Sequence, residues 1–132
     1  MPTKEPSRTP AFQARIDRVV QAFAQAEGDL SAVLHKDVVA YTSSRFSDNC
    51  EALDIPTDLV SYLDKVALHA YKITDGDVEK LQAAGYSDDA IFELTVGGSL
   101  GAGLATWEAG RSAIEAFFDG NNMKNREDGY AA

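Results

Sequence analysis

The chain contains few of the residues on which thiol and metal chemistry depend. Cys50 is the one cysteine among 132 residues, so the chain cannot form an internal disulfide. The two histidines, His35 and His69, lie far apart in the sequence and have no spaced partner ligands, so they make no recognisable metal motif. We therefore expect no bound metal and no cofactor.

Positive charge and long apolar runs are also scarce. Twelve Lys and Arg residues face 21 Asp and Glu residues, which gives a net charge of −9. Binding to nucleic acid or to anionic lipid requires a basic face, and this composition does not favour one. No apolar run is long enough to span a bilayer, and no signal peptide is visible. We expect a soluble, cytoplasmic protein that binds neither nucleic acid nor membranes.

The sequence does have a strong helical period. Pro10, capped by Thr9, begins a run that Gly28 ends and in which apolar residues recur at spacings of three and four. A second helical run starts near Leu30 and reaches Tyr41. Residues 42–56 are rich in Ser, Asn and Asp and favour a loop, and a third helix follows from Thr57. This pattern predicts an all-α protein.

Helix signals are densest between residues 74 and 89. Thr74 and Asp77 have the spacing of a capping box, in which each residue satisfies a backbone N–H near the other. Gly85 is suited to end that short helix in the left-handed conformation, and Ser87 to cap the next helix. These signals predict a short helix, a tight turn and a long final helix.

The long helix is expected to run from Asp88 to Phe118 and contains "GGSLGAG" at 97–103. Four glycines in a helix interior cost about 1 kcal/mol each relative to alanine. Close approach of a neighbouring helix explains them better than a phosphate-binding loop, which needs a preceding strand and ordered glycines. We predict a flexible arm at 1–9, one helical domain at 10–118 and a polar tail at 119–132.

The stretch "ITDGDVEKLQAAGYSDDAIFELTVGGSLGAGL" resembles the core of the carboxymuconolactone decarboxylase and alkylhydroperoxidase AhpD-like superfamily. The resemblance covers roughly residues 55–118. It implies an AhpD-like helical domain in which the long, small-residue-rich C-terminal helix packs on a helical hairpin. It also implies a homo-oligomer, which would be a dimer, trimer or hexamer.

The sequence departs from that superfamily at the redox site. The peroxidase branch carries a Cys-x-x-Cys motif, a histidine four residues on and an upstream glutamate. Counted back from Gly85, these positions fall near Ala70, Ile73, Asp77 and Asp58. Alanine and isoleucine have no thiol chemistry, so the resemblance implies that the redox dithiol has been lost.

Three functions remain open at this point. The first is a non-redox small-molecule binding or interaction protein. The second is a cysteine-independent decarboxylase or hydrolase that uses His69 with the carboxylate of Asp77 or Glu93 as acid and base. The third is a peroxidase-related enzyme acting through Cys50, which would require a cation or a helix N-terminus beside the thiol.

Each candidate residue also has a structural interpretation. His69 is placed to complement the C-terminal end of a helix, and Glu93 to complement the N-terminal end of the long helix. The candidates for lining a pocket are Tyr71, Ile73 and Trp107, although aromatic residues at helical spacing more often belong to a core.

Overall fold

The fold was analysed in a computed structural model, which describes residues 9–46 and 54–127. The predicted all-α class is confirmed, because the ordered elements of the described residues are all helical. They are α1 (Thr9–Gln25), α2 (Ala32–Ser44), α3 (Thr57–Leu68), a 3-10 turn η1 (Ala70–Lys72), α4 (Asp75–Ala83) and α5 (Asp88–Glu127). Cys50 lies outside the described residues.

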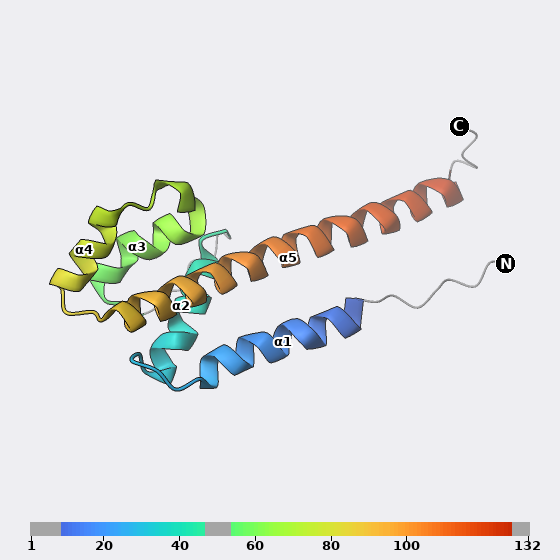
Figure 1. Cartoon of the computed structure of the whole chain (residues 1–132). Helices are drawn as coiled ribbons and strands as arrows, with labels where there is room; N and C mark the ends of the chain where they lie inside the picture. The colour runs from blue at the N-terminus through green and yellow to red at the C-terminus, as the bar shows by residue number, and fades with distance from the viewer. Residues whose placement is uncertain (1–8, 47–53, 128–132) are drawn as a thin grey trace.

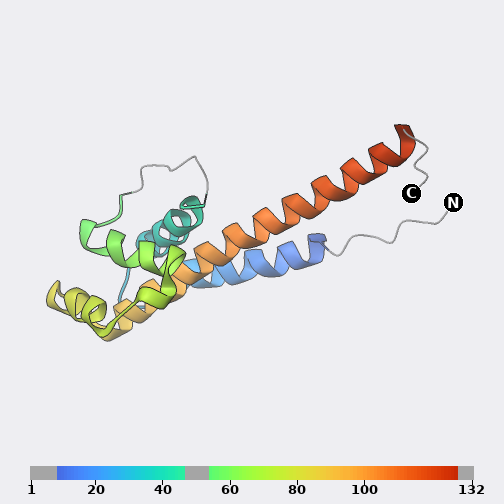
Figure 2. The same ribbon diagram turned by 90° about the horizontal axis from the view of Figure 1, so that it is seen from above.

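The long helix α5 organises the molecule (Figure 1). Its first part packs most extensively against α2 and then against α3, while the α3–η1–α4 hairpin lies beside its N-terminal end. Helix α1 runs alongside α5 in the opposite direction (Figures 1 and 2). We call residues 88–102 the inner half of α5 and residues 103–120 its outer half. The outer half extends away from α2, α3 and α4 in both views.

The hydrophobic core lies between α2, α3 and the inner half of α5. Leu59, Leu63 and Leu94 are fully buried, and Val38 is almost so. Each such side chain contributes roughly 1.5–3 kcal/mol to folding by leaving water. The remaining members of the core cluster come from α3, α4, the inner half of α5 and the loop before α2: Leu30, Tyr62, Val66, Leu81, Ala90 and Ile91.

The helix signals at 74–89 act as the sequence predicts. Thr74 and Asp77 form a capping box at the start of α4. Gly85 has φ of 103°, a conformation that favours glycine, and α4 ends just before it. The Ser87 hydroxyl accepts a hydrogen bond from the Ala90 N–H at 3.0 Å and so caps α5.

Glycines of the inner half lie where other helices approach closely. A Cβ on Gly97 would lie 2.7 Å from the Phe23 ring, and one on Gly98 would lie 2.9 Å from Val66 Cγ1. A Cβ on Gly101 would overlap Thr42 Oγ1 and the backbone oxygen of Val39. Close helix packing therefore explains these three glycines, as the sequence analysis predicted.

Several predicted helix ends were wrong. The final helix continues past Phe118 to Glu127, through residues expected to form a tail. That stretch contains Gly120 and three asparagines but no proline, so it lowers helix propensity without preventing a helix. Helix α2 likewise extends to Ser44, into the predicted loop, and α1 ends at Gln25 before Gly28.

Candidate functional site

The carboxylate of Glu93 anchors the loop between α1 and α2. Its Oε2 accepts a hydrogen bond from the Asp29 N–H at 2.8 Å, and its Oε1 accepts a weaker one from the Leu30 N–H at 3.5 Å. The His35 Nε2 lies 2.8 Å from Oε1. A Cβ at Gly28 would overlap this carboxylate, so glycine is required for the approach of the loop.

His35 is the partner of Glu93 that the sequence analysis did not identify. Its side chain is 1% exposed, and its ring lies against Phe23 with 4.6 Å between centroids. Because Glu93 accepts, Nε2 is the donor, and the buried Nδ1 has no hydrogen-bond partner. A substrate cannot reach a histidine that is buried in this way. The Glu93–His35 pair therefore connects α5 to α2 and is not an open acid–base site.

Asp77 also has a structural role. It accepts a hydrogen bond from Lys65 Nζ at 2.7 Å and another from the Thr74 N–H at 2.9 Å. The bond from Lys65, followed by the one from Thr74, lowers the pKa of the Asp77 carboxyl. A carboxylate whose pKa is lowered is a weaker base, and this one joins α3 to α4.

His69 ends α3, as the structural interpretation of the sequence predicted. Its backbone N–H donates to the Lys65 carbonyl at 2.8 Å, and its exposed ring meets Tyr71 edge-on at 6.0 Å. The side chain borders a hollow of about 630 Å³ whose charged lining residues are Arg45, Asp64 and Lys65.

The three predicted catalytic residues do not assemble into one site. Within the described part of the chain, no hydrogen bond or ion pair joins any two of His69, Asp77 and Glu93. The carboxylate in the His69 hollow is that of Asp64, which is 3.0 Å from Arg45 Nε.

The three predicted pocket residues lie in different surroundings. Tyr71 is 81% exposed, whereas Ile73 packs against the hydrophobic core. The Trp107 indole N–H donates to Gln13 Oε1 at 2.9 Å, and its ring meets Phe12 edge-on at 6.5 Å. Trp107 thereby attaches α5 to α1 and does not share a pocket with the other two.

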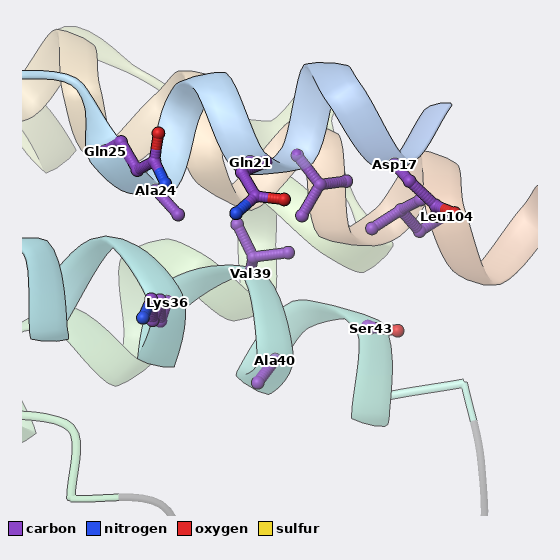
Figure 3. Close-up of a pocket in the computed structure, with 10 residues that line it drawn as sticks. Asp17, Gln21, Ala24, Gln25, Lys36, Val39, Ala40, Ser43 and Leu104 are labelled. Atoms are coloured by element: carbon purple, nitrogen blue, oxygen red, sulfur yellow. The ribbon is translucent and has the colours of Figure 1, made fainter. Parts of the chain in front are cut away.

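Among the clefts lined by described residues, the candidate for binding a ligand lies between α1 and α2 and has a volume of about 500 Å³ (Figure 3). Small and branched apolar side chains form part of its lining, and polar side chains form the rest. The apolar residues are Val20, Ala24, Val39, Ala40 and Leu104, and the polar residues are Asp17, Gln21, Gln25, Lys36 and Ser43. The sequence analysis missed this cleft, although Val20 and Ala24 have the i, i+4 spacing of one helix face.

The cleft carries opposite charges at separate places. Asp17 and Lys36 lie toward opposite ends of the view in Figure 3, with Gln21 and Val39 between them. Asp17 accepts a hydrogen bond from Gln13 Nε2 at 3.0 Å, whereas Lys36 takes part in none of the ion pairs of the described residues. Such a cleft suits a molecule with an apolar middle and polar ends.

Metal and membrane sites were sought in the same residues. No three His, Cys, Asp or Glu side chains of the described residues lie close enough together to hold a metal ion. None of the described helices combines the length and the apolar character needed to cross a bilayer.

Comparisons of the chain with models of protein families, with curated proteins and with solved structures found no match in any of the three. The resemblance to the AhpD-like superfamily therefore stays a prediction, and the argument for function rests on the geometry above.

Proposed function

We propose that the protein is a non-redox binding protein that takes a small amphipathic molecule into the cleft between α1 and α2. The observation that carries this proposal is the size and lining of the cleft. Its volume of about 500 Å³ lies within the range of roughly 300–1,000 Å³ that is usual for small-molecule sites. Its lining combines five apolar and five polar side chains, and polar groups of this kind can fix the orientation of a bound ligand.

The polar groups of the cleft define the class of ligand. The Lys36 ammonium is available to an acidic group, and the apolar side chains of Val39 and Leu104 suit a hydrocarbon or aromatic body. We therefore favour a small organic acid with an apolar body. Lys36 provides a positive charge for the acidic group, although a chain with a net charge of −9 has few cations to offer.

A fluorescence titration with 8-anilino-1-naphthalenesulfonate tests this proposal, because the dye combines aromatic rings with a sulfonate. We expect the dye to bind the native protein, and Ala40→Trp, which fills the cleft from an exposed position, to remove most of the signal. Lys36→Gln should weaken binding about two- to fivefold, as expected for the loss of one exposed charge contact.

Ala83→Trp is the matched control, since Ala83 is an exposed alanine on α4 and does not line the cleft. It should bind the dye as the native protein does. An unchanged titration in Ala40→Trp would place the dye elsewhere and refute the proposed site.

A hydrolase-type activity at His69 is a second candidate. The ring is exposed beside a hollow that also contains Arg45 and Lys65, which are paired with Asp64 and Asp77. The general acid–base partner in this hollow would be Asp64 rather than Asp77 or Glu93. Hydrolysis of p-nitrophenyl acetate by the native protein but not by His69→Gln would support it, and equal rates in both would reject it.

The peroxidase alternative through Cys50 stays open to a direct assay. The positions that correspond to the superfamily dithiol, Ala70 and Ile73, contain no sulfur. Peroxide consumption in the presence of a dithiol, measured on the native protein and on Cys50→Ser, tests the remaining thiol. We expect no consumption by either protein. We also retain a cytoplasmic location as part of this proposal. Homo-oligomeric assembly stays a separate prediction that ligand binding in the cleft does not require.

A further inference from the structure

The outer half of α5 carries an apolar seam with the spacing of a coiled coil. Gly103, Trp107, Gly110, Ile114 and Phe117 follow one another at intervals of four, three, four and three residues. This spacing places all five residues on one side of the helix, where a coiled coil contacts its partner helix. The inner half does not need such a seam, because α2 and α3 already cover it.

Helix α1 contacts the seam at Trp107, but the seam residues beyond Trp107 are exposed within the described chain. Ile114 is 58% exposed and Phe117 is 64% exposed. Beyond Trp107, the hydrogen bonds, ion pairs and ring contacts of the described side chains all remain within α5. Most helical stability in proteins comes from packing of an apolar face, and this segment of α5 lacks that stabilisation without a partner.

The two glycines of the seam indicate what kind of partner fits. A Cβ at Gly103 or Gly110 would meet nothing within 4 Å, so packing inside the chain does not explain either residue. Over Gly110 lies a hollow of about 250 Å³ that is bordered by Trp107, Ile114 and neighbouring side chains. A hollow between two large apolar residues accepts a side chain from a facing helix.

The charges of this segment are arranged for contact with a second acidic chain. Its acidic residues, Glu108, Glu115 and Asp119, all lie off the seam. Arg111 flanks the seam and is held by Glu108 at 2.7 Å and by Glu115 at 3.0 Å on its own helix. Glu115 borders the hollow over Gly110, but its carboxylate is paired with Arg111 of its own helix. Two copies of a chain with net charge −9 can therefore meet along the seam without an unpaired carboxylate at the hollow.

We propose that the outer half of α5 pairs with the same segment of a second copy of this chain, with the two helices antiparallel. In this register Ile114 enters the hollow over the partner's Gly110, and Phe117 packs on the partner's Trp107. Each contact occurs twice around a two-fold axis, as an isologous dimer requires. The exposed ring of Phe12 on α1, which contacts Trp107, borders the same apolar face.

The proposal specifies the partner and does not depend on the ligand cleft, because the seam and the cleft share no lining residue. A dimer without dye binding would leave this inference standing while the proposed function failed. Dye binding by a protein that stays monomeric would support the proposed function and overturn the dimer.

Sedimentation equilibrium of the full chain over a range of concentrations tests the dimer. We expect the native protein to reach twice the chain mass of 14.2 kDa. Gly110→Leu fills the hollow but meets open space within its own chain, so the folded monomer should remain while the dimer Kd rises by about tenfold or more. Ile114→Lys should abolish the dimer.

Ala109→Leu is the matched control, because Ala109 is the exposed neighbour of Gly110 and points away from the seam. Its dimer Kd should equal that of the native protein. A native chain that remains monomeric at all concentrations overturns the proposal. So does a dimer that Gly110→Leu and Ile114→Lys leave unchanged.

Cysteine cross-linking decides the orientation in a Cys50→Ser background. A mixture of Gly110→Cys and Ile114→Cys chains should form mainly the mixed disulfide if the helices are antiparallel. Preferential Gly110→Cys homodimers would instead show parallel helices and overturn the proposed register.

Discussion

The two halves of α5 both contain glycines and large apolar residues, but their surroundings differ. The inner half contains Gly97, Gly98 and Gly101, each beside a side chain of another helix. The outer half contains Gly103 and Gly110, and neither has a neighbour within 4 Å of an added Cβ. In the inner half, glycine therefore permits close packing against another helix of the same chain. In the outer half, on our proposal, it permits close packing against a second copy.

Truncation of a large apolar residue in each half should give the largest difference. Leu94 is fully buried, so Leu94→Ala should lower the free energy of unfolding by about 2–5 kcal/mol. Ile114→Ala should change it by less than about 0.5 kcal/mol, because Ile114 is already 58% exposed. Urea unfolding at a dilution at which the chain is monomeric measures both values. Equal losses would contradict the distinction between the halves.

Loss of the Glu93 carboxylate should have the next largest effect. Glu93→Ala leaves the Asp29 N–H and the His35 ring without their acceptor, which should cost about 2–4 kcal/mol. The same urea experiment measures this loss. Glu79→Ala, on an exposed face of α4, is the control and should change stability by less than about 0.5 kcal/mol. A small effect at both positions would show that the anchored loop contributes little to stability.

Addition of a methyl group should have opposite signs in the two halves. Gly101→Ala would overlap Thr42 and the Val39 carbonyl and should destabilise the fold by about 1–3 kcal/mol. Gly103→Ala meets open space and should stabilise the monomer by up to about 1 kcal/mol through helix propensity. Thermal unfolding followed by circular dichroism compares the two variants. If both variants changed the thermal stability in the same direction, the distinction between the two halves of α5 would be contradicted.

Acidification should change the stability of the protein least. This change should arise in the α3–α4 hairpin rather than in α5. Lys65 and Thr74 lower the pKa of Asp77 in the folded state, so the stabilisation is complete above the ordinary carboxyl pKa of about 3.9. It is lost as the pH falls through the lowered folded-state value. Asp77→Asn should therefore be less stable than the native protein at neutral pH, and this difference should shrink in acid. A constant difference across that pH range would contradict the role given to the carboxylate.

The sequence predicted the parts of this fold that depend on near neighbours. The capping box at Thr74, the turn at Gly85 and the cap at Ser87 each need only residues within a few positions, and all three are present. The all-helical class likewise follows from apolar spacing within each helix. The predicted C-terminal end of α5 was wrong, because helix propensity alone does not determine where a polar helix stops.

The parts that were missed depend on residues distant in sequence. His35 and Glu93 are 58 positions apart, and no local pattern joins them. The cleft between α1 and α2 similarly requires Leu104, from a third helix. The sequence analysis offered His69 with Asp77 or Glu93 as an acid–base pair, but in the fold each of the three residues has other hydrogen-bond partners.

The loop anchored by Glu93 also bears on the order in which the chain folds. A protein chain is synthesised from its N-terminus to its C-terminus. Helices α1 and α2 are therefore made well before Glu93, whose carboxylate fixes the loop between them. Closure of this loop must wait for a contact across 64 residues, which carries a high entropic cost. Helix α1 is therefore expected to dock late in synthesis, after the first turns of α5 have formed.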